Sequence, residues 1–191
     1  MSTLLLTALL QLQITVAPQP PNNSAQSAVV VFDGVVNSQR QLDTPRSIEG
    51  LVPFVQPSLR SMGQWKFGPA TPVGERVSIT FLYRAHTLLP DNPRELNLAR
   101  QASGPDRPAL PTRIIDPGYP VNSIGEGPVI LQLRIGVTGQ VQNVMVARET
   151  PSLTELAVRA ASQWKFTPAI VNGKPAASTA IIVIYFWRPV L

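Results

Sequence analysis

One short string occurs twice in this chain, and equivalent positions of the two copies are 99 residues apart. The residues Gln-Trp-Lys-Phe stand at 64–67 and again at 163–166, followed in each case by a Pro-Ala pair after one further residue. Arg60 and Arg159 keep the same offset. A chain of 191 residues that repeats itself once is most simply two tandem copies of one small domain.

Composition restricts the classes of function. Hydrophobic residues make up 44% and charged residues 14%, which is typical of a globular protein. The net charge of +5 comes from dispersed arginines without a basic run, so we expect no nucleic-acid binding. The absence of cysteine excludes disulfides and thiolate metal sites, and the single histidine, His86, cannot build a His-rich site. The chain also lacks the spacing of a phosphate loop or a nucleophile elbow, so we expect no cofactor, no metal and no enzyme activity.

The second half predicts the order strand, strand, helix, strand. Residues 129–135 and 141–146 read as a hairpin of two strands around a Thr-Gly turn. Apolar residues then recur at helical spacing from 153 to 164, and Pro168 stops the helix. A final strand rich in isoleucine, valine and aromatic residues is expected at 179–187.

The first half gives the same order with weaker signals. Strands are expected at 28–36, 41–48 and 77–83, with Pro45 limiting the second strand to an edge. An apolar helical stripe lies between the second and third of these strands.

Two local signals concern the helices. Ser152 and Glu155 have the spacing of a capping box, which predicts the start of the second helix. Pro53 and Pro57 are expected to shorten the first helix to about two turns.

The segment between the two copies is rich in proline. Its composition predicts an extended and fairly stiff spacer, with one short helix beginning near Asn92.

The first 17 residues allow two interpretations. Their length and apolar character fit a cleavable signal peptide ending at Ala17, which would imply export. The alternation of Leu10, Leu12, Ile14 and Val16 with polar residues fits a β-strand instead. The run is too short for a membrane-spanning helix.

Taken together, residues 113–188 resemble the C-terminal domain of the TonB family of energy transducers. The matching features are Pro117-Gly118-Tyr119-Pro120 before the first strand, Thr138-Gly139 in the hairpin turn, and the Trp-Lys-Phe string after the helix. The first half resembles the same domain through its strand order and its own copy of the string.

The resemblance implies an α+β fold of two tandem TonB C-terminal-like domains. In each domain an antiparallel sheet would pack on one helix. The expected organisation is a signal peptide at 1–17, a degenerate copy at 28–84, a Pro-rich linker at 85–112 and a second copy at 113–191.

The resemblance also implies a periplasmic or cell-envelope adaptor. Domains of this family bind a short segment of outer-membrane TonB-dependent receptors, which adds as a strand to the edge of the sheet. The final strand is the edge that we expect here, with Ile181, Val183, Tyr185 and Trp187 as partner-binding residues.

Other residues have alternative interpretations. Tyr119 and Pro120 mark the partner groove by resemblance, or they fix where the chain enters the domain. The aromatic residues of the repeated string are expected in the structural core, since aromatic residues at a helix exit usually pack: Trp65, Phe67, Trp164 and Phe166.

A structural role is the alternative to an adaptor. The two halves would then pack into one larger sheet that serves a scaffold or a homodimer. The family's transducers carry an N-terminal membrane anchor and a Pro-rich periplasmic spacer, whereas the Pro-rich stretch here lies between the copies. Whether this chain takes part in energy-dependent transport is therefore left open.

Overall fold

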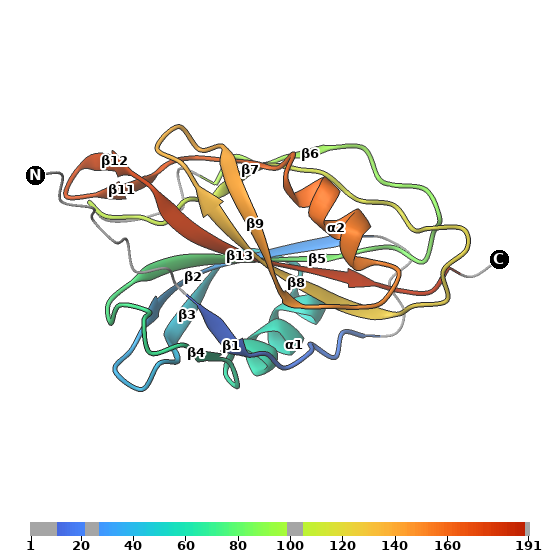
Figure 1. Cartoon of the computed structure of the whole chain (residues 1–191), viewed down its shortest axis with the longest axis horizontal. Helices are drawn as coiled ribbons and strands as arrows, with labels where there is room; N and C mark the ends of the chain where they lie inside the picture. The colour runs from blue at the N-terminus through green and yellow to red at the C-terminus, as the bar shows by residue number, and fades with distance from the viewer. Residues whose placement is uncertain (1–10, 22–26, 99–104, 190–191) are drawn as a thin grey trace, which may run out of the picture.

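The computed structural model of this chain describes residues 11–21, 27–98 and 105–189. Its central feature is one six-stranded sheet with the strand order β3-β2-β5-β13-β8-β9 (Figure 1). The strands are β2 (Ala28–Val36), β3 (Leu42–Glu49), β5 (Arg76–Tyr83), β8 (Gly127–Ile135), β9 (Val141–Arg148) and β13 (Ser178–Phe186). The mixed α+β class expected from the sequence is therefore present, but the two halves share a single sheet.

The two halves are joined where their last strands meet. Strand β13 pairs in parallel with β5, from Ala180 opposite Ser78 to Tyr185 opposite Tyr83. On its other side β13 pairs with β8 in antiparallel register from Ser178 to Phe186. Both sides of β13 are therefore hydrogen-bonded, and the expectation that the final strand is a free edge is wrong.

Residues in the central strands are buried on both faces of the sheet. Strands β2, β8 and β13 are rich in valine and isoleucine and are almost wholly buried. Such continuous apolar strands are stable only where both faces are covered, whereas a strand with one wet face alternates in polarity.

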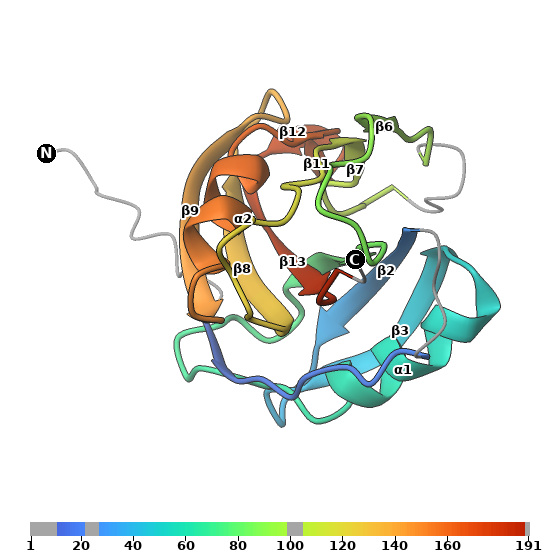
Figure 2. The same ribbon diagram turned by 90° about the vertical axis from the view of Figure 1, so that its right-hand side faces the viewer.

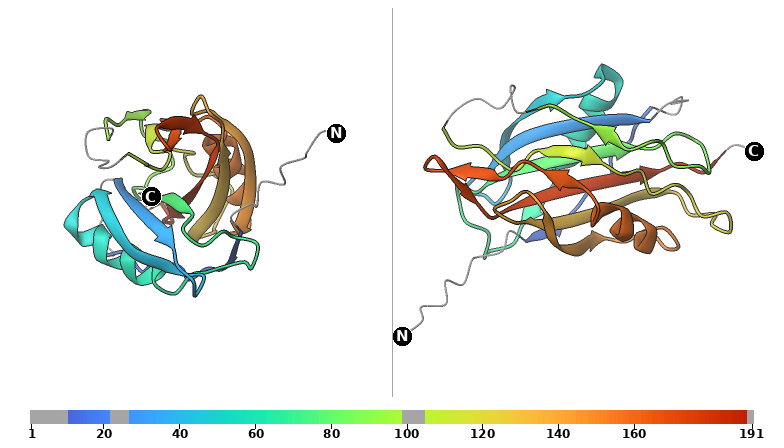
Figure 3. Two further views of the ribbon diagram at one scale, coloured as in Figure 1. Left: turned by 90° about the vertical axis from the view of Figure 1, so that its left-hand side faces the viewer. Right: turned by 90° about the horizontal axis from the view of Figure 1, so that it is seen from above.

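The two helices cover opposite faces of this sheet. Helix α1 (Val52–Met62) packs with one core cluster and helix α2 (Thr154–Ala161) with the other. Figures 2 and 3 show α1 and α2 on opposite sides of the curved sheet. The last strands of the two halves, β5 and β13, pair in parallel, yet the two helices lie on opposite faces. One half is therefore turned over relative to the other. We name the two sides the α1 face and the α2 face.

Both helices differ from their sequence-based predictions. Helix α1 has 11 residues and continues through Pro57. Because Pro57 lies in the second turn, it removes only one intrahelical bond, and burial of Phe54 and Met62 anchors the helix. Ser152 does not cap α2, since the cap position is Leu153 and makes no side-chain bond.

The start of α2 is held by a pair of threonines instead. The Thr150 amide donates to Oγ1 of Thr154 at 3.0 Å, and that hydroxyl donates to the Thr150 carbonyl at 2.9 Å. Ser152 has a positive φ of 65°, which places it in the turn before the helix rather than at its cap.

The repeated string forms the same corner in both halves. In the first half, β1 (Leu12–Ile14) pairs with β4 (Lys66–Phe67); in the second, β7 (Pro111–Ile114) pairs with β10 (Lys165–Phe166). Leu12 lies opposite Phe67 and Pro111 opposite Phe166, so both members of the pair keep the 99-residue offset.

The indole hydrogen bonds of the corner keep this offset too. Trp65 Nε1 donates to the carbonyl of Val16 at 3.2 Å, and Trp164 Nε1 donates to the carbonyl of Ile115 at 3.0 Å. The aromatic residues of the string are all buried, at 0–5% exposure: Trp65, Phe67, Trp164 and Phe166.

The N-terminal segment belongs to the fold from residue 11 onward. Leu12 is buried on the α1 face, and its amide donates to Oε1 of Gln132 at 3.0 Å. The β-strand interpretation is thus confirmed for Leu12–Ile14, although Ile14 is exposed, and Leu10 lies outside the described residues. A cut after Ala17 would remove β1 from the fold.

The Pro-rich segment does not form a free spacer. It lies over the α2 face, where Leu98, Ala109 and Leu110 join the core. The helix expected near Asn92 is absent, and β6 (Arg94–Glu95) pairs there with β7. The hairpin of β11 (Ala169–Val171) and β12 (Lys174–Ala176) completes the fold.

Tyr83 lies beside the seam between the halves. Its hydroxyl is 2.7 Å from Oγ of Ser58, which donates to the Phe54 carbonyl at 2.8 Å. Burial is the main reason that the pKa of Tyr83 lies well above its ordinary value of 10.0.

We expect a variant that lacks residues 1–17 to be less stable than a variant that lacks residues 1–10. Loss of residues 11–17 exposes the core surface that Leu12 covers and leaves the Trp65 indole without its acceptor. The free energies of unfolding should therefore differ by about 3 kcal/mol or more. Urea unfolding of both variants measures it. Equal unfolding midpoints would contradict a structural role for β1.

We expect stability to fall at alkaline pH, in part through Tyr83. Its contribution is complete below pH ~10 and is lost above it, because the unfolded chain releases the phenolic proton while the folded chain keeps it. The slope from this group is about 1.4 kcal/mol per pH unit. In urea unfolding between pH 9 and 11.5, Tyr83→Phe should show a shallower decline than the parent chain. An unchanged decline would show that Tyr83 is not the cause.

Candidate partner-binding surface

The large sheet has two outer strands, β3 and β9, and they differ in character. Strand β3 carries Pro45, the charged residues Asp43 and Arg46, and a positive φ of 35° at Thr44. Its pairing with β2 is interrupted twice by shifts of register. Proline, charge and bulges are the features that protect an edge strand from pairing with another chain.

Strand β9 has few of these features. It contains no proline, and its first seven residues carry no charge. In the part of the chain that the structure describes, β9 pairs only with β8, with register shifts at its two ends. Along the continuous run from Asn143 to Val146, no described strand pairs with the outer backbone groups of β9.

The side chains of β9 divide between the two faces. Val144 and Val146 lie opposite Leu133 and Leu131, which belong to the core on the α2 face. Asn143 and Met145 lie opposite Arg134 and Gln132. Because opposed residues of an antiparallel pair share a face, these residues lie on the α1 face.

The predicted partner-binding residues of the last strand do not lie at an outer edge of the sheet. Ile181 and Val183 are completely buried in the core of the α1 face. Tyr185 is half-buried, and Trp187, just after β13, is 6% exposed and stacks on His86 with ring centroids 4.9 Å apart. In this structure these side chains are packed within the protein itself.

Tyr119 and Pro120 line a groove of about 440 Å³ beside α2. Tyr119 is 6% exposed; its hydroxyl donates to the Gly125 carbonyl at 2.7 Å, and its amide donates to the Leu88 carbonyl at 2.9 Å. Tyr119 thus anchors its own segment and also borders the groove. Both a role in chain entry and a role in partner binding therefore remain open for Tyr119 and Pro120.

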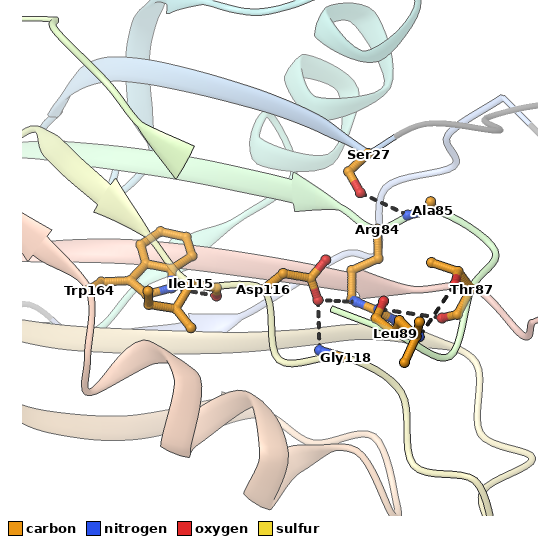
Figure 4. A network of polar contacts seen from close by, with 9 residues as sticks. All are labelled: Ser27, Arg84, Ala85, Thr87, Leu89, Ile115, Asp116, Gly118 and Trp164. Carbon is orange, nitrogen blue, oxygen red and sulfur yellow. Dashed lines mark hydrogen bonds and ion pairs between the residues drawn. The ribbon is translucent and has the colours of Figure 1, made fainter. Parts of the chain in front are cut away.

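A buried ion pair fixes the walls of this groove (Figure 4). Arg84 Nε donates to Oδ1 of Asp116 at 2.6 Å, and both side chains are nearly inaccessible. The same carboxylate oxygen accepts the Gly118 amide at 2.7 Å, while Nη2 of Arg84 donates to the carbonyls of Thr87 and Leu89 at 3.4 and 3.2 Å. The guanidinium thereby holds residues 87–89 against residues 116–118.

Sequence reasoning missed this ion pair. Arg84 lies at the end of an apolar strand and Asp116 lies 32 residues later, without a motif that joins them. Their burial follows from the packing of the linker on the sheet. Arg84 also lies 5.6 Å above the ring of Phe186, so it contacts both halves of the seam.

The described ranges lack two features that would indicate another class of function. No helix there is both long and apolar enough to span a membrane. No cluster of three or more histidine or acidic side chains there has the arrangement of a metal site.

We expect Arg84→Met to lower the free energy of unfolding by about 3–5 kcal/mol, because it leaves the Asp116 carboxylate buried without its cation. The matched control is Arg113→Met, which breaks the exposed pair with Glu95 and should cost about 1 kcal/mol or less. Urea unfolding measures both. Similar losses in the two variants would contradict the role of the buried pair.

Comparison with known proteins gives a family match for part of the chain. Residues 122–187 match the family model described as the C-terminal domain of the Gram-negative bacterial TonB protein. No curated protein and no solved structure matches the chain. The matched segment takes in β8, β9, α2 and β13, so this half of the chain is similar to a TonB C-terminal domain, a type of protein-interaction module found in the envelope.

Proposed function

We propose that this chain is a protein-binding module of the cell envelope that acts in the periplasm. Its partner is an outer-membrane TonB-dependent receptor or another envelope protein, which it engages by strand addition without any catalytic step. The observation that carries the proposal is the TonB match over residues 122–187, in a sheet whose outer strand β9 is open.

We further propose that the first half is a degenerate second copy of the same module. The support lies in contacts that repeat at the 99-residue offset: β1 on β4 and β7 on β10, and each indole on the carbonyl of a preceding segment. The order strand, strand, helix, strand is also the same in both halves.

This duplication changes the role of the final strand. In the proposal, β5 of the first copy takes the place on β13 that a partner strand would take in a single module. Ile181, Val183, Tyr185 and Trp187 then hold the two copies together, and an outside partner has to use another edge.

A scaffold without energy transduction is the second candidate. The observation that favours it is the seam itself, which satisfies β13 within one chain and joins both halves into one sheet. A scaffold of this kind would associate with itself through the remaining edge.

We expect the immobilised full chain to retain an outer-membrane receptor from a detergent-solubilised outer-membrane fraction. A synthetic peptide of the short receptor segment that adds as a strand should compete for binding, because strand addition needs only a short segment. The control is the same chain unfolded in urea before immobilisation.

Two results would overturn the adaptor proposal. One is retention of the receptor by the unfolded chain to the same extent, which would indicate nonspecific adsorption. The other is the absence of receptor together with concentration-dependent dimers in analytical ultracentrifugation, which would favour the scaffold.

A further inference from the structure

We propose that β9 is the strand to which the partner segment adds, and that this segment alternates apolar with acidic residues. The inference rests on the proposed function and names its surface and the chemistry of its partner. It follows from three properties of β9: the open backbone, an apolar α2 face and a basic α1 face.

The open backbone selects β9 over the other strands. Among the described strands of the large sheet, β2, β5, β8 and β13 have partners on both sides. Only β3 and β9 are outer strands, and β3 carries Pro45 together with two register shifts. A partner strand needs several successive backbone bonds, which the regular run from Asn143 to Val146 can supply.

The α2 face beside this edge is apolar. Val144 and Val158 are partly buried against the core of this face, and Val146 is 40% exposed. Side chains of an added strand would alternate between the faces, and those on the α2 face would lie next to these valines. Apolar side chains would remove this surface from water, which is the larger source of affinity.

The α1 face beside the same edge is basic. Arg134 and Arg148 lie on this face of β8 and β9, opposite Asn143 and Ile130 respectively. Strand β9 itself has no acidic residue. Two carboxylates come from neighbouring elements. Glu75 interacts electrostatically with Arg134, and Glu149 directly follows β9 in the chain.

Those neighbours do not cancel the positive charge. Glu75 is partly buried, and the described residues show no salt bridge between either carboxylate and Arg134 or Arg148. Nη1 of Arg148 donates a hydrogen bond to the carbonyl of Thr15 at 3.4 Å. Acidic side chains on this face of an added strand would therefore meet an attractive potential.

The experiment uses the full chain and two blocked eight-residue peptides. One peptide alternates valine with glutamate, and the other alternates valine with lysine. We expect the glutamate peptide to bind at least about threefold more tightly, since each exposed ion pair strengthens binding by about 1.4-fold to fivefold. Hydrogen exchange should show new protection at residues 141–148 and none at residues 42–49.

Matched variants locate the site. Asn143→Glu adds a negative charge on the α1 face of β9, and Ser47→Glu adds one at an exposed position of β3. Asn143→Glu should weaken the glutamate peptide and strengthen the lysine peptide, each by about twofold to fivefold. Ser47→Glu should change neither affinity.

Several outcomes would overturn the inference while leaving the proposed function intact. Protection at 42–49, or an equal effect of Ser47→Glu, would place the partner on β3. Peptide binding only in a variant lacking residues 1–10 would show that the chain's own N-terminus occupies β9. A dimer that Asn143→Glu dissociates would identify a second copy as the occupant. If a receptor bound but neither peptide did, the alternating apolar and acidic partner segment would be excluded, while receptor binding itself would stand.

Discussion

The parallel pairing of β5 with β13 is the interaction on which the rest of this structure depends. It joins the last strands of two similar halves, from Ser78 opposite Ala180 to Tyr83 opposite Tyr185, so that a single sheet replaces two small ones. A half of this size has little capacity for a core of its own. Sharing a sheet lets each half bury strand faces that it could not cover alone.

The seam also determines what must cover each face. Because the second half is turned over relative to the first, each helix covers only its own half of the sheet, on its own face. The remaining areas are covered by segments outside the large sheet and the two helices. The segment around β1 lies on the α1 face, and the linker with Leu98 and Leu110 lies on the α2 face. Both segments therefore behave as parts of the fold.

Local sequence patterns predicted where strands lie better than they predicted how each element packs against the rest of the protein. The valine and isoleucine runs placed β2 and β8 to within two residues, since a strand's side-chain pattern is a local property. The first helix was predicted too short because burial of Phe54 and Met62 outweighs the single bond lost at Pro57. Proline content likewise suggested a spacer, although the apolar residues between the prolines pack on the sheet.

By itself the sequence determined the repeated string, the strand order of each half and the aromatic residues of the corner, because these are carried by residue identity and spacing. Only the tertiary structure decided which strand edges are open. Every strand has the same backbone donors and acceptors, so its own residues do not reveal whether a neighbour pairs with them. The final strand β13 was the expected edge, but β5 pairs with it. Strand β9 is an outer strand of the sheet instead.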